Sequence, residues 1–181
     1  MKKKMEHKGI LLFCISVIGL LIIAIIPKNV VTISNAVVNE NNGDIAFCYL
    51  YPTKNPILNV DLYNKDGEKI FSKTFKTSGS YAYLRFNNNN ELIVCYGKSD
   101  KKTCIIDRSG IVSDTDIPSE IISSGDSFKG WNSVRGKKSY SWDTYTYLYE
   151  SPTVFHRKAK MVIINNGASK TIYDSECFKD K

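Results

Sequence analysis

The sequence predicts an all-β domain outside the cytoplasm, preceded by one N-terminal transmembrane helix. Residues 9–26 form an uncharged apolar run, and after it no window of helical length repeats apolar residues with the 3.6-residue period of a helix. The remainder alternates short β-branched and aromatic runs with turns rich in Asn, Asp and Gly. We therefore expect the domain to be built from antiparallel meanders.

The apolar run is long enough to cross a bilayer. As a helix with a rise of ~1.5 Å per residue it would span about 27 Å, close to the ~30 Å hydrocarbon core. Lysines precede the run, so the positive-inside rule places the N-terminus in the cytoplasm. The alternative is a cleaved signal peptide, whose nearest small-x-small site is Ser34-Asn35-Ala36. The favoured division is a cytoplasmic stub (1–8), a signal-anchor helix (9–26), a linker (27–35) and an extracytoplasmic β-rich domain (36–181).

Several segments of the domain are typical of strands joined by tight turns. Leu58, Val60 and Leu62 alternate with less apolar residues, which is the period-2 pattern of a half-buried strand. The Asp66-Gly67 pair that follows favours a hairpin, because glycine tolerates the positive φ that such turns need. Further strands are expected at 45–51, 81–86 and 92–96.

A repeated unit runs through these segments. Residues 41–51 (NNGDIAFCYLY) parallel 88–97 (NNNELIVCYG), while 59–71 parallels 103–113 and 161–173. In the second set a glycine marks each turn: Gly67, Gly110 and Gly167. The pattern of apolar strand, Asx-x-Gly turn and apolar strand resembles the blades of bacterial β-propeller repeat proteins over most of residues 36–174. The resemblance implies a blade-like scaffold, as a partial propeller or a sandwich, and leaves the function open.

Four cysteines follow the apolar run: Cys48, Cys95, Cys104 and Cys177. If Ser99-Asp100 is the tip of a hairpin, Cys95 and Cys104 lie opposite each other at a separation that suits a disulfide. Cys48 and Cys95 occupy equivalent repeat positions, which favours the alternative that they are small buried apolar residues. A bridge between Cys48 and Cys177 is also left open. No metal site or cofactor is expected, because there is no C-x-x-C pair and the domain has a single histidine, His156.

Residues 130–150 contain both tryptophans and are the candidate ligand-binding stretch. Exposed aromatic rings beside cations stack on sugars and contact anionic groups. Outside the cytoplasm the expected ligand is a cell-wall glycan or an anionic polymer, and not nucleic acid. The alternative is core packing, which we favour for the row formed by Tyr145, Tyr147 and Tyr149 and leave open for the tryptophans. The candidate residues are Trp131, Arg135, Lys137, Lys138 and Trp142.

The net charge is +7, and the excess of basic residues over acidic ones is greatest in 129–160. Such a patch indicates either an anionic neighbour or an ordinary solvated surface.

No nucleophile, zinc or phosphate-binding motif is present. Scattered carboxylates, Asp61, Asp66 and Asp107, and His156 are the remaining acid–base candidates, although Asp66 and Asp107 lie where aspartate shapes turns. The sequence therefore favours a membrane-anchored, non-catalytic extracytoplasmic binding or scaffold module for an envelope ligand or partner protein. The alternatives are an envelope hydrolase or transferase, or an accessory subunit whose helix contacts another membrane protein through Ser16 and Gly19.

Overall fold

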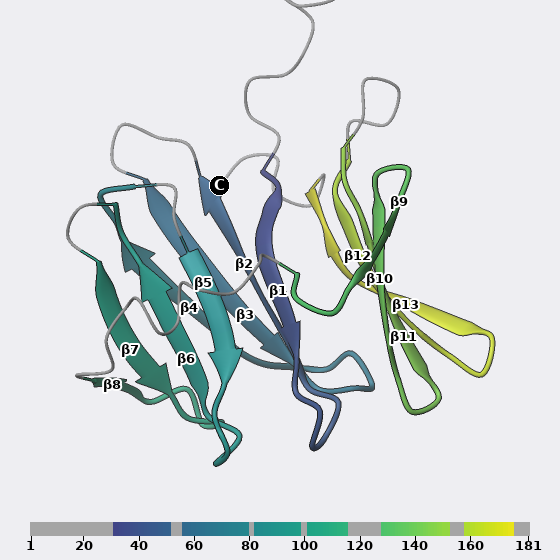
Figure 1. Ribbon diagram of the computed structural model, residues 1–181, viewed down its shortest axis with the longest axis horizontal. Coiled ribbons are helices and arrows are strands. Elements are labelled where there is room, and N and C mark those ends of the chain that lie inside the picture. Colours follow the sequence, from purple (N-terminus) through teal and green to yellow (C-terminus); the bar gives the residue numbers. More distant parts are fainter. Residues whose placement is uncertain are drawn as a thin grey trace, which may run out of the picture.

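The computed structural model describes residues 31–51, 56–79, 82–98, 101–115, 128–152 and 158–175. Within these ranges the chain forms thirteen β-strands in three antiparallel sheets (Figure 1). The predicted all-β fold is therefore confirmed. None of the described segments is a helix long and apolar enough to cross a membrane, and the expected anchor at 9–26 lies outside them.

Each sheet is a meander, because strands that are neighbours in space are also neighbours along the chain. The first sheet contains β1 (Ile33–Val38), β2 (Ile45–Tyr51), β3 (Ile57–Tyr63) and β4 (Lys69–Lys76). The second contains β5 (Ala82–Phe86), β6 (Leu92–Tyr96), β7 (Lys102–Ile106) and β8 (Val112–Asp114). The third contains β9 (Asn132–Val134), β10 (Lys137–Trp142), β11 (Tyr145–Glu150), β12 (Lys160–Asn165) and β13 (Ala168–Asp174).

The described β-structure begins before residue 36, the expected start of the domain. Strand β1 begins at Ile33, inside the range assigned to the linker, and Ile33 pairs with Tyr49 of β2. The strand pattern was hidden because Ser34 and Asn35 interrupt the apolar residues, at a register shift between Ile33 and Asn35.

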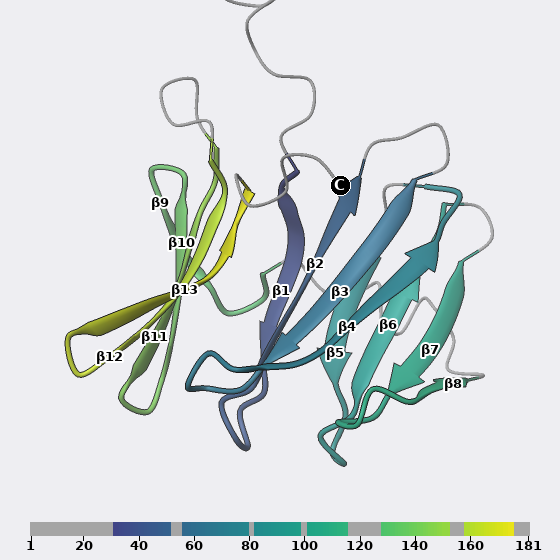
Figure 2. The same cartoon turned by 180° about the vertical axis from the view of Figure 1, so that it is seen from behind.

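The first sheet is the middle layer of the molecule (Figures 1 and 2). On one side, residues such as Cys48 and Val60 join the core cluster that contains Leu84 and Val94 of the second sheet. On the other side, residues such as Phe47 join the core cluster that contains the tyrosines of β11. Burial on both faces explains why β2 is a nearly continuous apolar run.

Three hairpins share one five-residue turn. In each, the first residue donates its backbone N–H to the carbonyl of the fifth, and its side-chain oxygen accepts the N–H of that fifth residue. The fourth residue has positive φ, between 63° and 85°. The turns are Asn64–Glu68, Asn87–Glu91 and Asp107–Ile111, with Gly67, Asn90 and Gly110 at the fourth position.

The repeat seen in the sequence corresponds to these hairpins. Residues 59–71 and 103–113 are the last hairpins of the first and second sheets, and 161–173 is the last hairpin of the third. In the third sheet the turn is shorter, with Asn166 and Gly167 at φ of 49° and 81°. The repeated unit is therefore the closing hairpin of each meander.

The tight turns of the first two sheets lie at one end of the fold, which we call the turn end. Asn39 donates its side-chain amide to Asn90, and this bond holds the turn ends of the first and second sheets together. The Trp142 indole of the third sheet donates to the Glu40 carbonyl in the β1–β2 turn, and this bond holds the turn ends of the first and third sheets together. At the opposite end, the Tyr173 hydroxyl donates to the carbonyl of Val31, where the described chain begins.

The turn of the last hairpin provides a test of backbone conformation. A Cβ added at Gly167 would meet nothing within 4 Å, so a substitution there reports on φ alone. We expect Gly167→Val to lower the free energy of unfolding by about 1–3 kcal/mol, and Gly167→Asn by less than about 1 kcal/mol, because asparagine tolerates positive φ. Denaturant unfolding of the full-length protein in detergent measures both, and equal losses would contradict the assigned turn.

Candidate functional site

The tyrosine row of β11 packs into the core, as the sequence favoured. Tyr145, Tyr147 and Tyr149 are 8 %, 0 % and 2 % exposed. The Tyr147 hydroxyl donates to the carbonyl of Gly43, and the Tyr145 hydroxyl donates to the Asp66 carboxylate over 3.1 Å. The row therefore joins the third sheet to the turns of the first.

Both tryptophans of the candidate stretch also pack at this junction. The Trp142 ring lies against Gly43, where a Cβ would overlap it, and its Nε1 donates to the Glu40 carbonyl over 2.8 Å. Trp131 meets Phe128 edge to face, with ring centroids 5.4 Å apart. Its buried Nε1 has no hydrogen-bond partner within the described part of the chain. Their observed contacts are those of structural residues.

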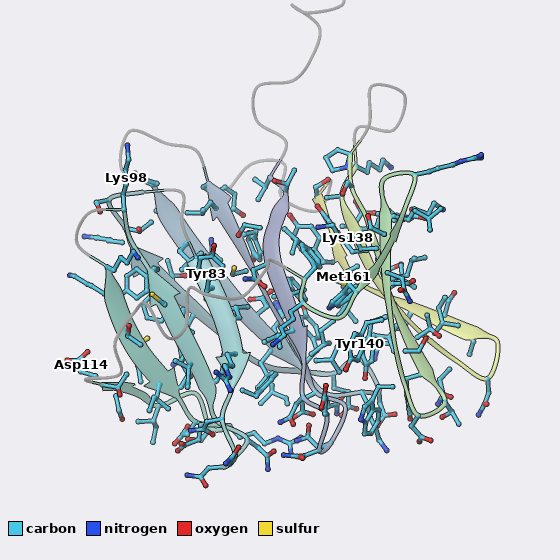
Figure 3. All side chains as sticks on the ribbon, in the orientation of Figure 1. Tyr83, Lys98, Asp114, Lys138, Tyr140 and Met161 are labelled. Carbon is cyan, nitrogen blue, oxygen red and sulfur yellow. The ribbon has the colours of Figure 1, made fainter. Side chains whose placement is uncertain are left out.

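The three candidate cations have separate surroundings. Arg135 is exposed at the tip of the β9–β10 hairpin, with φ of 46°. Lys137 forms an ion pair with Glu150 at 2.6 Å. The Lys138 Nζ lies 3.8 Å from the centre of the Phe128 ring, where burial lowers the pKa of the lysine. Figure 3 places Lys138 with Tyr140 and Met161 on the side of the third sheet that faces β1.

The five candidate residues do not converge on one site. Lys137 points to the opposite face of β10 from Lys138 and Trp142, because side chains alternate along a strand. Lys138 and Trp142 share a face, but four residues of strand separate them by roughly 13 Å. Ligand binding by this set stays a prediction.

The structure does not form the predicted disulfide between Cys95 and Cys104. Cys95 pairs with Thr103 and Cys104 with Val94, so the two side chains lie on opposite faces of the second sheet and are not joined by a disulfide. Cys177 lies outside the described residues. Burial raises the pKa of Cys48 to about 12 and that of Cys104 to about 11, so both stay as unreactive thiols near neutral pH.

The scattered carboxylates have local partners. Asp107 accepts hydrogen bonds from the Ser109 hydroxyl and the Ile111 N–H within its turn, and these bonds hold its pKa below the usual value. Asp66 lies in the β3–β4 turn, while His156 is outside the described residues. The described ranges contain no group of three or more His, Cys, Asp or Glu residues that could hold a metal ion.

Asp61 belongs to a polar surface on β3 and β4 that sequence reasoning missed. Its side chain is 1 % exposed, accepts a hydrogen bond from the Ser72 hydroxyl and forms an ion pair with Lys69 at 3.1 Å. Two cross-strand pairs further along the hairpin, on the same face, the Thr74 hydroxyl donates to the Asn59 side-chain oxygen over 2.8 Å. We call this set the polar shelf: Asn59, Asp61, Lys69, Ser72 and Thr74, with the neighbouring Tyr51.

One polar atom of the shelf lacks a partner. Asn59 is 9 % exposed, and its buried Nδ2 forms no hydrogen bond with any residue in the described ranges. A buried donor without a partner costs about 1–3 kcal/mol, so such an atom calls for an explanation. The hydroxyls of Ser72 and Thr74 beside it belong to exposed residues. The shelf thus presents one buried amide donor together with accessible hydroxyl groups.

Tyrosine rings border the shelf on the β2 side. The rings of Tyr49 and Tyr51 meet edge to face at 5.9 Å, and Tyr49 lies 5.2 Å from Tyr173 of the third sheet. Burial, and next the Asp61 charge, raise the pKa of both Tyr49 and Tyr51. Both phenols therefore stay protonated and neutral near neutral pH. Neutral hydroxyls, an amide and a partly buried ring form a surface suited to polyhydroxylated ligands.

The sequence contained only part of the signal for the shelf. The Asn64–Glu68 turn alone would place Asn59 opposite Lys73, but the register shift between Leu62 and Tyr63 places Asn59 and Asp61 opposite Thr74 and Ser72. Two polar pairs in register on one face of a hairpin indicate a surface that the core does not cover. The alternation in β3 alone predicted only a half-buried strand.

A comparison of the chain with protein-family models, curated proteins and solved structures finds no match.

The role of Trp142 is tested by removing its ring. We expect Trp142→Ala to lower the free energy of unfolding by roughly 2–4 kcal/mol, because it removes the contact with Gly43 and the hydrogen bond to Glu40. Val134→Ala is the control; Val134 is 67 % exposed, and its loss should stay within about 0.5 kcal/mol. Denaturant unfolding of the full-length protein measures both changes. If Trp142→Ala left the free energy of unfolding unchanged, the result would contradict a structural role for Trp142 at the junction.

Proposed function

We propose that the chain is a single-pass membrane protein whose β-rich domain, outside the cytoplasm, is a non-catalytic binding module for a polyhydroxylated cell-envelope ligand such as a glycan. Its three meanders serve as blade-like units of a rigid scaffold. The polar shelf on β2–β4 is the binding surface. The observation that carries the proposal is the buried Nδ2 of Asn59, which has no hydrogen-bond partner among the residues that the structure describes.

The shelf has the chemistry that glycan recognition requires. A sugar offers hydroxyl groups that both donate and accept, and an apolar face that packs on aromatic rings. Asn59 Nδ2 is a buried donor without a partner among the described residues, the Ser72 and Thr74 hydroxyls lie on exposed residues, and Tyr51 lies on the neighbouring strand β2. A ligand hydroxyl that accepts from Asn59 would remove the cost of its unpaired donor.

The fold also bears on the choice between an anchor and a cleaved signal peptide. Cleavage after Ala36 would cut within β1 and remove Ile33, which is 4 % exposed in the core. It would also remove Val31, whose carbonyl accepts the Tyr173 hydroxyl. An uncleaved chain keeps these contacts, which supports a permanent anchor at 9–26.

The alternatives from the sequence have weaker support. A hydrolase or transferase needs a carboxylate that is free to act, but Asp61 is engaged by Lys69 and Ser72. An accessory-subunit role rests on the face of the expected helix that contains Ser16 and Gly19, which lies outside the described residues.

Ligand binding is tested by co-sedimentation of the full-length protein, in detergent, with purified peptidoglycan sacculi. We expect wild-type protein to be retained and the double variant Tyr51→Ala/Thr74→Ala to bind roughly thirtyfold more weakly. The loss corresponds to about 2 kcal/mol, for one ring contact and one hydrogen bond.

The matched control is Ser169→Ala/Thr171→Ala, which truncates exposed residues of β13 away from the shelf. It should bind as the wild type does. Equal retention of the shelf variant, after denaturant unfolding has shown that it is folded, would refute the proposed surface.

The anchor is tested by alkaline carbonate extraction of membranes and by N-terminal sequencing. We expect the full-length chain to stay in the membrane with its N-terminal segment intact. Ile15→Lys/Ile18→Lys/Ile22→Lys should shift it to the soluble fraction, since each lysine at the centre of a helix costs about 3 kcal/mol of insertion free energy. Ile15→Leu/Ile18→Leu/Ile22→Leu is the control. A mature chain that begins after Ala36 would contradict the anchor.

A further inference from the structure

Cations gather at the end of the fold opposite the turn end. The strand registers place Lys76, Lys102 and Lys160 at this end of the first, second and third sheets. The bonds from Asn35 to the Ala82 carbonyl and from Tyr173 to Val31 show that the ends of the three sheets lie together. Among the described residues this basic end contains Lys76, Lys98, Lys101, Lys102, Arg135, Lys137, Lys158 and Lys160, against the carboxylates Glu150 and Asp174.

The turn end has the opposite balance. Its described carboxylates are Glu40, Asp44, Asp66, Glu68, Glu91, Asp107 and Asp143, against Lys65, Lys69, Arg85, Arg108 and Lys170. Several of these charges are satisfied within the turns, including Asp44 by Arg108 and Asp107 by its own loop. In Figure 3, Lys98 projects from the opposite end, away from the sheets.

The N-terminus of the described chain lies at this same end. Val31 is the first described residue, and β1 runs from here toward the turn end. The apolar run ends at Ile26, so four residues lie between it and Val31, and the chain makes five residue-to-residue steps from Ile26 to Val31. A fully extended chain of that length reaches about 17 Å. If residues 9–26 span the bilayer, the basic end is held close to the membrane surface and the turn end faces away.

We propose that the basic end docks on the anionic phosphate headgroups of the outer membrane leaflet and fixes the orientation of the domain. The inference rests on the proposed anchor and is independent of the ligand of the polar shelf. Attraction between the cations and lipid phosphates falls off within a Debye length, about 8 Å at physiological ionic strength. The short tether brings the cations into that range. A polyanionic wall polymer has the same phosphate chemistry, but no feature of the structure places it at this end, whereas the tether places the bilayer there.

Amine footprinting of the full-length chain tests the inference. The protein is reconstituted into lipid bilayer discs of phosphatidylcholine, with or without phosphatidylglycerol, and lysine acetylation is measured by mass spectrometry. We expect acetylation of Lys76, Lys98, Lys102 and Lys158 to slow about threefold or more in the anionic discs. Lys65 and Lys170, at the turn end, are internal controls and should not change. High salt should remove the protection, because the interaction is electrostatic.

Two charge-matched variants sharpen the result. Lys98→Gln/Lys102→Gln/Lys158→Gln should abolish the protection of Lys76, whereas Lys65→Gln/Arg85→Gln/Lys170→Gln, with the same loss of charge, should leave it. Equal acetylation in both kinds of disc would overturn the inference. Protection by a soluble poly(glycerol phosphate) polymer, without protection by anionic discs, would overturn it in favour of a wall polymer.

The outcome is separable from that of the proposed function. A chain that fails to insert is mixed with preformed anionic vesicles and labelled in the same way; protection confined to the basic end then supports the docking surface, and its absence refutes it. Loss of sacculus binding by the shelf variant leaves the footprint unaffected.

Discussion

The structure depends on the burial of the first sheet from both sides. Strand β2 contributes Ala46 and Cys48 to the core shared with the second sheet, and Phe47 and Tyr49 to the core shared with the third. Neither outer sheet shares a core cluster with the other among the described residues. Any loss of order in the first sheet would therefore disrupt the cores of both the second and the third sheet.

The two junctions use different physical interactions. The junction with the second sheet is mainly aliphatic, with Leu58, Val60, Val94 and Ile106 fully or almost fully buried. The junction with the third sheet is aromatic, and its tyrosine and tryptophan polar groups bond to turn carbonyls at Glu40 and Gly43. Large rings with one polar atom suit such a junction, because the ring fills the core while the hydroxyl or N–H satisfies a turn. The aromatic residues of 130–150, which the sequence offered as a candidate ligand-binding stretch, thus pack between the first and third sheets.

Local chemistry made much of the fold predictable. The Asn-, Asp- and Gly-containing turns located the hairpins, and the alternation of Tyr145, Tyr147 and Tyr149 identified a buried face. Register was harder: the predicted disulfide failed because a shift of one residue moves a side chain to the other face of a sheet. The polar shelf depends on which part of the middle sheet the third sheet leaves uncovered. Apart from Tyr63, β3 and β4 contribute nothing to the core on that side, and pairings this distant in sequence leave no local pattern.

The bond between Tyr173 and Val31 links the two ends of the described chain across 142 positions. A domain threaded through a membrane N-terminus first would expose Val31 early and Tyr173 last. In that case the backbone at Val31 would reach its final position only after β13, which contains Tyr173, had been exported. Contacts between such distant positions form slowly, so export of the C-terminal hairpin would set the time at which the whole domain matures.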